Sequence, residues 1–236
     1  MSNIRLFFPE SLSFNFKSTL NKSQSHYLIK VMRVKIDESF SLFNKNGEWS
    51  AKINKISKGN VEFIVQEKLR KQVNPKEIWL AFSPIKSNYF NFMIQKATEL
   101  GVTKFIPIIF DRTIVRKINE ERLEKIIIEA TEQSNRINVP TMEKPTNLKN
   151  FLNKNSKKID LIFTDLNTSK KKLNIDKISN KPLCVIIGPE GDFSAEEREQ
   201  ISNFDGVNPI KINHNILRAE TAAISTISII SYILNL

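Results

Sequence analysis

The pattern of apolar and polar positions changes character about a third of the way along the chain. In the first part, short apolar or alternating runs are separated by turn signals around Asn46-Gly47 and Gly59-Asn60. The predicted strands cover residues 6–8, 39–43, 49–56 and 61–65. Residues 23–31 instead have helical spacing, with apolar side chains at Tyr27, Leu28 and Val31. This part is predicted to form a small β-barrel with one helix.

After the proline-punctuated stretch at residues 71–75, apolar strands alternate with amphipathic helices. Strands are predicted at residues 78–82, 105–110, 161–164, 183–187 and 210–212. A helix over 90–100 ends at Gly101, and Asn119 caps a longer helix that runs to Gln133. Uninterrupted apolar strands are typical of parallel sheets that are covered on both faces. We therefore expect two domains, residues 1–72 and 73–236, the second of α/β class.

The chain shows none of the features of an exported, membrane-spanning or disulfide-bonded protein. No apolar run reaches the roughly 18 residues of a membrane span, and the N-terminus lacks a secretory signal. Cys184 is the only cysteine, so neither an internal disulfide nor a cysteine-rich zinc site is expected. His26 and His214 are too few for a histidine-built metal site. These observations predict a cytoplasmic protein without a metal.

The formal charge of +11 suggests a polyanionic partner. The suggestion is weakened because Lys, Asn and Ile are abundant throughout, as an A/T-rich coding sequence would produce. Arginine is more informative, since each of the nine departs from this preference for lysine and offers a bidentate fork. They are Arg5, Arg33, Arg70, Arg112, Arg116, Arg122, Arg136, Arg198 and Arg218.

Three segments carry candidate chemistry. The buried strand 183–187 runs into Gly188-Pro189-Glu190-Gly191, and residues 194–197 form a capping box that opens a helix. Such a loop lies where open α/β sheets place ligands, and its glycines permit left-handed backbone and close approach. A purely structural turn remains the alternative. No G-x-G-x-x-G or G-x-x-x-x-G-K-[ST] sequence is present, which favours a nucleotide-like ligand without phosphates, such as S-adenosylmethionine.

The other two segments are Leu217-Arg218-Ala219-Glu220-Thr221, at the start of an apolar helix, and residues 129–136, at the end of a helix. The first offers free backbone N–H groups to a polar ligand, although Arg218 and Glu220 can equally be a surface ion pair. The second can equally be a solvated helix end. Both interpretations stay open from the residues alone.

Four motifs together resemble one known family. The motifs at residues 95–102, 132–136, 187–197 and 217–221 resemble those of the RsmE family of the SPOUT superfamily, and residues 5–8 and 26–33 resemble its N-terminal domain. The resemblance implies a PUA-like RNA-binding barrel followed by a methyltransferase domain with a parallel sheet and a deep trefoil knot. Two positions depart from the family pattern, because Asn135 and residues 83–88 lack the usual glycine. Asn135 can still adopt left-handed backbone.

The resemblance implies S-adenosylmethionine-dependent methylation of uridine N3 in 16S ribosomal RNA, free or in the 30S subunit, by a homodimer. The implied cofactor-binding residues are Thr164, Ile187, Gly188, Pro189, Glu190, Gly191, Ile212, Leu217, Arg218, Ala219 and Thr221. The implied RNA-binding residues are Arg5, Lys30, Arg33, Lys86 and Arg112.

Uridine N3 carries a proton that must leave before or during methyl transfer. Arg218 and Arg136 are therefore expected to stabilise the developing anion, with Arg136 acting in its own chain or in a partner's site. Glu190, Glu132 and Glu220 are the candidate proton acceptors, and the sequence does not rank them. A SPOUT enzyme for another RNA, such as transfer RNA, and a non-catalytic ribosome-assembly protein are the alternatives.

Overall fold

The computed structural model describes residues 4–72, 76–168 and 178–234. It divides the chain into two compact units, Met1–Asn74 with Thr131–Val139, and Pro75–Ala130 with Pro140–Leu236. The first boundary lies close to the one expected after residue 72. Residues 131–139 differ from the expectation, because they belong to the first unit rather than the second. The hydrogen bonds responsible are described with the candidate site.

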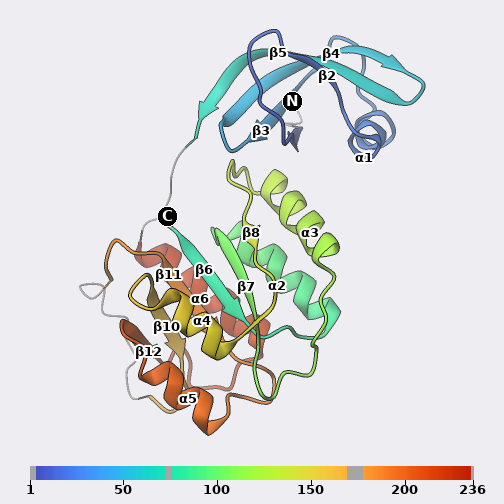
Figure 1. The fold of residues 1–236 in the computed structure, drawn as a ribbon. Coiled ribbons are helices and arrows are strands. Elements are labelled where there is room, and N and C mark those ends of the chain that lie inside the picture. The colour runs from blue at the N-terminus through green and yellow to red at the C-terminus, as the bar shows by residue number, and fades with distance from the viewer. Residues whose placement is uncertain (1–3, 73–75, 169–177, 235–236) are drawn as a thin grey trace. The chain divides into compact units, whose positions relative to one another are not determined.

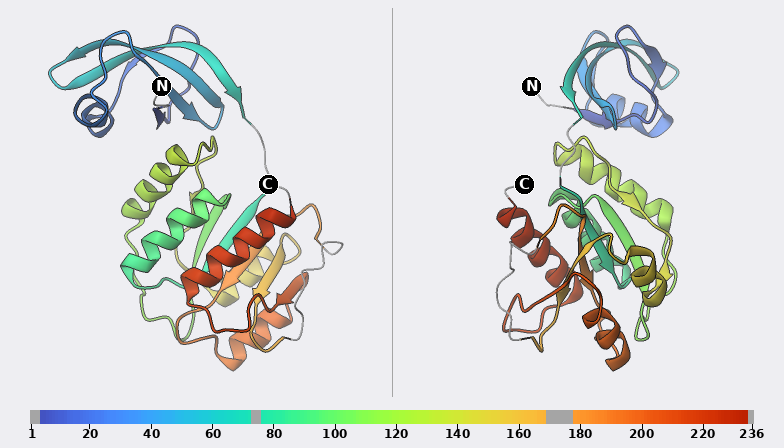
Figure 2. Two further views of the ribbon diagram at one scale, coloured as in Figure 1. Left: turned by 180° about the vertical axis from the view of Figure 1, so that it is seen from behind. Right: turned by 60° about the vertical axis from the view of Figure 1, so that its left-hand side comes forward.

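The first unit contains a five-stranded sheet with the order β1-β3-β4-β5-β2. Its elements are β1 (Arg5–Phe7), β2 (Lys17–Thr19), α1 (Lys22–His26), the π-helical turn η1 (Tyr27–Val31), β3 (Ser39–Asn44), β4 (Gly47–Ser57) and β5 (Asn60–Lys71). β1 pairs with β3 in parallel, and the other pairs are antiparallel. The sheet curls around its core (Figure 2). β2 was not predicted because its three residues are polar and largely exposed.

Aromatic side chains fill the core of the first unit. The Phe63 ring lies 5.3 Å from that of Phe8 and 6.1 Å from that of Phe40, both nearly perpendicular to it. Val61 and Val65 are also fully buried, so alternate residues of β5 face inwards. The alternation that predicted this strand therefore reflects its one buried face.

The second unit is a parallel sheet covered by helices, as the sequence predicts. Its strands are β6 (Ile78–Phe82), β7 (Lys104–Ile109), β8 (Thr141–Met142), β9 (Thr146–Asn147), β10 (Asp160–Thr164), β11 (Leu183–Ile187) and β12 (Val207–Ile210). Its helices are α2 (Ser87–Glu99), α3 (Glu120–Gln133, whose last three residues are counted with the first unit), α4 (Leu148–Asn155), α5 (Ala195–Ser202) and α6 (Ala219–Ile233). The strand order is β12-β10-β11-β6-β7-β8, with β9 paired to β7, and every pair is parallel.

Helices α2 and α6 pack on one face of this sheet, and α4 and α5 on the other (Figure 1). Every residue of β6 and β11 is buried, which explains their unbroken apolar sequences. The strand expected at residues 210–212 ends instead at Ile210 and begins at Val207. The trefoil knot stays a prediction.

Several local signals act as expected. Asn119 Oδ1 accepts a hydrogen bond from the Arg122 N–H at 3.0 Å at the start of α3. Gly101 has a φ of 105° after α2, and Asn135 has a φ of 61°, the left-handed conformation expected where the family has glycine.

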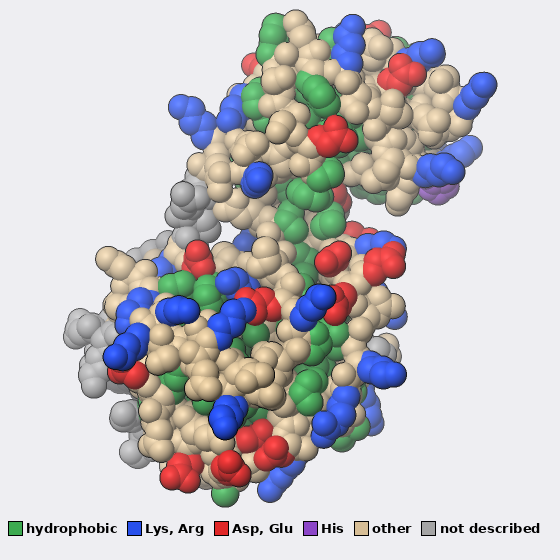
Figure 3. Space-filling model, in the orientation of Figure 1, with side chains coloured by type: hydrophobic (Ala, Val, Ile, Leu, Met, Phe, Trp, Pro, Cys, Tyr) green, Lys and Arg blue, Asp and Glu red, His purple; other side chains and the backbone are tan. Residues whose placement is uncertain are grey.

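Among the described residues, no helix is both long and apolar enough to cross a bilayer. On the face drawn in Figure 3, basic side chains are interspersed with acidic ones.

Candidate active site

A cavity of about 660 Å³ opens at the carboxyl ends of β10, β11 and β12. It is lined by the segment after β10, by the loop after β11, by the segment from the end of β12 into α6, and by Lys86 and Tyr89. Ligand pockets for small molecules usually measure about 300–1,000 Å³. The cavity is therefore of the size and in the place expected for a nucleotide-like ligand.

Most of the residues predicted to bind a cofactor line this cavity. They are Thr164, Ile187, Gly188, Pro189, Glu190, Ile212, Leu217, Arg218 and Ala219, joined by Glu220 from the predicted catalytic set and Lys86 from the predicted RNA-binding set. Gly191 and Thr221 are not among the lining residues. The two motifs, remote in the sequence, thus meet in one hollow.

Gly188 is required for a reason other than the one expected. Neither Gly188 nor Gly191 has left-handed backbone, which in this loop occurs at Asp192, with a φ of 62°. A Cβ on Gly188 would instead come within 2.7 Å of the Phe193 ring. That ring packs edge-to-face against those of Phe110 and Phe163, with distances between ring centroids of 5.2 Å and 5.3 Å. Close packing of the loop on a fixed aromatic ring therefore explains the glycine.

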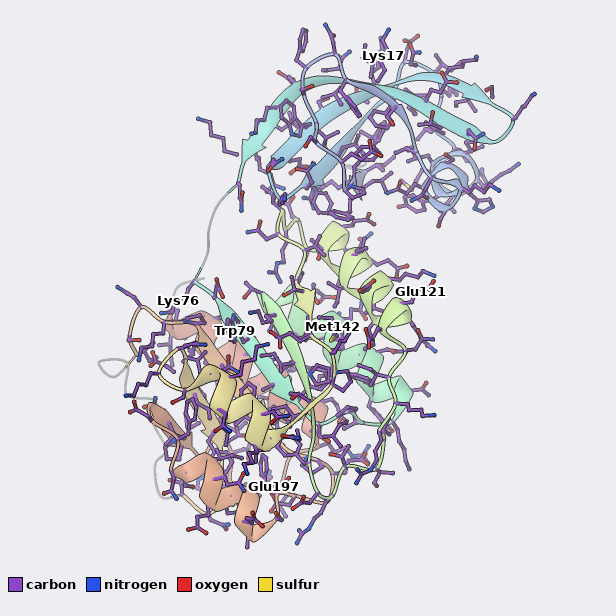
Figure 4. All side chains as sticks on the ribbon, in the orientation of Figure 1. Lys17, Lys76, Trp79, Glu121, Met142 and Glu197 are labelled. Carbon is purple, nitrogen blue, oxygen red and sulfur yellow. The ribbon has the colours of Figure 1, made fainter. Side chains whose placement is uncertain are left out.

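The segment after β7, residues Asp111 and Arg112, is hydrogen-bonded to this loop and to the start of α5. Arg112 Nη1 donates to the Gly191 carbonyl at 2.9 Å, and Ser194 Oγ donates to Asp111 Oδ2 at 2.7 Å. Glu197, labelled in Figure 4, accepts a hydrogen bond from the Asp111 N–H at 2.8 Å and also completes the expected capping box of α5. Arg112 remains exposed, so the contact with Gly191 uses only part of its guanidinium.

Tyr89 and Arg198 are among the lining residues that were not predicted. Tyr89 is 46% exposed, and the Arg218 guanidinium lies 5.5 Å from the centre of its ring. The sequence offers no signal for it, because Tyr89 and the buried Phe90 are adjacent aromatics and only packing distinguishes them. Arg198 forms ion pairs with Asp165 and Asp192, which also line the cavity. The scarcity of arginine is the one sequence signal that could have singled out Arg198.

Glu132 and Arg136, predicted to be catalytic, are bonded within the first unit and do not line the cavity. Glu132 Oε1 accepts from the Phe7 N–H at 2.9 Å, and Arg5 donates to the carbonyls of Glu132 at 2.9 Å and Arg136 at 2.8 Å. Burial lowers the pKa of Arg136 to about 10, so it stays charged at neutral pH. This segment holds β1 through its backbone.

Arg5 does not have the placement expected of a phosphate-binding residue. It is 7% exposed, and its Nε lies 2.9 Å from Glu48 Oε1. Its guanidinium donates to Glu48 and to the carbonyls of Thr131, Glu132 and Arg136, which is the placement of a structural residue, and its contact with RNA stays a prediction. Lys30 and Arg33, by contrast, are exposed on the first unit.

Comparison with known proteins gives a consistent result for both units. A family model described as an RNA methyltransferase domain matches residues 72–231, and one described as an RNA methyltransferase PUA domain matches residues 20–66. The ribosomal RNA small subunit methyltransferase E of Rickettsia conorii is 36% identical over 230 residues, covering 95% of this chain and 93% of the relative. That of Buchnera aphidicola from Acyrthosiphon pisum is 32% identical, covering 95% and 91%.

Two solved structures are also similar over nearly their whole length. The methyltransferase E of Neisseria gonorrhoeae bound to S-adenosyl methionine matches with a TM-score of 0.90 and 28% identity, covering 98% of each chain. A putative methyltransferase of Legionella pneumophila in complex with the same cofactor matches with a TM-score of 0.86 and 29% identity, covering 99% of this chain and 98% of that one. With a PUA-like unit, a parallel α/β unit and both predicted motifs at one cavity, the chain belongs to the ribosomal RNA small subunit methyltransferase E family.

Proposed function

We propose that this protein transfers a methyl group from S-adenosylmethionine to N3 of a uridine in 16S ribosomal RNA. The observation that carries the proposal is the cavity of the second unit, where the loop after β11 meets the segment that enters α6. The substrate and the atom follow from the family resemblance, and the relatives named above are small-subunit ribosomal RNA methyltransferases.

The residues of the cavity fit the cofactor. Ile187, Ile212 and Leu217 offer apolar surface for the adenine ring, and the lining loops present backbone N–H and C=O groups to its edge. S-adenosylmethionine, when bound, supplies a methyl group on a positively charged sulfur. No phosphate-binding loop is needed for such a ligand, which agrees with the sequence.

The charged residues of the cavity match the needs of the uracil. Arg218 is exposed to the cavity and is a donor fixed beside Tyr89, so it can stabilise negative charge as N3 loses its proton. We assign the acceptor role to the pair Glu190 and Glu220, because both line the same cavity. Glu132 and Arg136 we assign to holding β1 of the first unit.

RNA contacts are proposed on both units. Uridine N3 lies on the pairing edge, so the base must be single-stranded or extracted before it reaches the cavity. Lys30 and Arg33 are exposed on the PUA-like unit and are proposed to bind phosphate. Lys86, at the cavity, and Arg112, which also holds Gly191, are proposed to bind phosphates near the target.

A homodimer is proposed for the assembly. Tyr89 and Phe92 of α2 are 46% and 47% exposed, and Ile229 and Tyr232 of α6 are 38% and 84% exposed. These two helices pack side by side in the second unit (Figure 2), and the exposed apolar side chains that they carry are surface that a second copy can cover. Ribosomal RNA as substrate places the proposed activity in the cytoplasm.

The test uses the chemical consequence of the product. N3 methylation blocks base pairing, so reverse transcriptase should stop at one uridine of 16S ribosomal RNA from normal cells and read through it after the gene is deleted. A stop restored by the wild-type gene, but not by one encoding Arg218→Lys, would support the assignment. Unchanged stops in 16S RNA would contradict it, and loss of a stop in transfer RNA would favour the other RNA class.

A further inference from the structure

Arg198 joins two of the segments that line the cavity. It lies on α5, and its Nη2 is 2.8 Å from Asp192 Oδ2, in the loop after β11. Its Nη1 pairs with Asp165 Oδ1, in the segment after β10. Because Nη1 and Nη2 carry donors at fixed positions on one planar group, an arginine holds the two carboxylates in a defined geometry that the flexible ammonium group of a lysine does not impose.

Asp165 is the carboxylate most enclosed by this arrangement. Its side chain is 13% exposed, compared with 61% for Asp192. The Asp165 N–H donates to the Ile210 carbonyl at 3.0 Å, which fixes the backbone beside β12. Oδ1 also accepts a hydrogen bond from the Asn167 N–H at 3.1 Å. Among the described residues, Oδ2 has no hydrogen-bond partner.

The position of Asp165 is suited to a neutral ligand that donates hydrogen bonds. It lies directly after Thr164, at the carboxyl end of β10, which is the strand next to the β12 edge of the sheet, and it lines the cavity. Arg198, which it shares with Asp192, already supplies it with a cationic partner, so a ligand can bind Asp165 through neutral donors. Two adjacent hydroxyl groups, as on a ribose ring, are donors that a fixed carboxylate oxygen can accept together.

We propose that Asp165 recognises the ribose hydroxyls of the bound adenosine group, and that Arg198 is the positioning residue that holds Asp165 for this contact. The inference rests on the proposed cofactor, and it adds a specificity-determining residue that the sequence motifs do not contain. A hydrogen bond to a charged group is stronger than one between neutral groups. Loss of either hydroxyl should therefore weaken binding measurably.

The test is a calorimetric cycle that combines ligand and protein changes. The ligands are S-adenosylhomocysteine and its 2′-deoxy and 3′-deoxy analogues. In the wild-type protein, removal of at least one of the hydroxyls should weaken binding by about 10-fold or more. In Asp165→Ala the same removal should change binding by about twofold or less, because no acceptor is left to lose. Equal losses in the two proteins would overturn the proposal.

Asp192→Asn is the matched control, because it removes the other carboxylate that pairs with Arg198. It should keep most of the discrimination against the deoxy ligands, whereas Arg198→Lys should lose much of it. If Asp165→Ala does not fold, Asp165→Asn takes its place; it keeps the shape and one neutral acceptor but loses the charge, so the discrimination should fall without vanishing. Failure of the wild-type protein to bind S-adenosylhomocysteine would count against the proposed function itself. If the wild-type protein binds all three ligands equally well, only the role of Asp165 would be contradicted.

Discussion

The two units each contain an arginine–carboxylate network, and the two networks differ in what surrounds them. In the first unit, Glu48 is paired with Arg5 and Arg70, and the side chains of Arg5 and Glu48 are each 4% exposed. In the second unit, Arg198 is paired with Asp165 and Asp192 beside a cavity of about 660 Å³. The same chemistry therefore holds backbone segments together in one unit and joins segments that line a cavity in the other.

The network of the first unit has a clear electrostatic signature. Burial alone would raise the pKa of Glu48, but the hydrogen bonds and charges of Arg5 and Arg70 outweigh it and lower the pKa below its ordinary value of 4.5. Arg5 in turn bonds to the carbonyls of Glu132 and Arg136. Removal of one partner would leave a buried charge uncompensated.

The largest expected effect is on stability, in the first unit. Glu48→Gln should lower the free energy of unfolding by about 3–5 kcal/mol, because Arg5 would stay buried without its counter-charge. Urea unfolding measures this. Glu62→Gln is the control, since the Glu62–Lys55 pair is 3.9 Å apart and exposed, and it should cost less than about 1 kcal/mol. Similar costs for both variants would contradict a structural role for the Arg5 network.

Arg218→Lys should affect chemistry and leave the fold unchanged. Loss of a preorganised donor to the uracil anion should lower turnover about 100-fold, with an unchanged melting temperature. Arg122→Lys, at an exposed position near the start of α3, is the matched control and should retain full activity. Methyl transfer to 16S RNA in a single turnover measures both. Full activity of Arg218→Lys would remove this residue from the mechanism.

Gly188→Ala should distort the loop that lines the cavity, because the added methyl group has no room. Its Cβ would come within 2.7 Å of the Phe193 ring, and forcing such a contact usually costs about 1–3 kcal/mol. We expect weaker binding of S-adenosylmethionine together with a modest loss of stability. Gly191→Ala is the comparison, because its Cβ would meet Arg112 at a milder 3.3 Å, and it should retain more affinity. The reverse order would show that the role of Phe193 has been misjudged.

The smallest expected effect is the pH dependence of stability. The unfolded chain binds a proton at Glu48 more tightly than the folded chain does, because folding lowers this pKa. The stabilisation is thus complete above the unfolded pKa and is lost as the pH falls through the folded pKa. Between about pH 5 and pH 3, the unfolding free energy of the wild-type protein should fall more steeply than that of Glu48→Gln. Parallel slopes would rule out this contribution.

The sequence predicted periodic elements better than contacts between distant segments. Strands such as β6 and β11 were predicted at their observed bounds, because their apolar runs report burial on both faces. β2 and α4 were missed: the strand is short and polar, and the helix follows a stretch with weak signals. The assignment of residues 131–139 to the first unit depends on hydrogen bonds to Arg5 and Phe7, which no local pattern reveals.

The same limit applies to the site. Gly188, Glu190, Leu217 and Arg218 were predicted because they lie in recognisable motifs. Asp165 and Arg198 were not, because neither stands in a motif and their pairing is a property of the fold. An arginine in a lysine-rich chain indicates that its guanidinium has a specific role in folding or binding. Whether it is buried, as Arg5 is, or faces a cavity is decided by the structure.

The most direct test of the central claim is a calorimetric titration of S-adenosylmethionine into the purified wild-type protein, with Glu48→Gln at a temperature where that variant is folded. We expect binding at one site per chain with closely similar affinity in both proteins, because the cavity lies within the second unit and the Arg5 network within the first. Absence of binding by the wild-type protein would contradict the proposed function and favour a non-catalytic RNA-binding role.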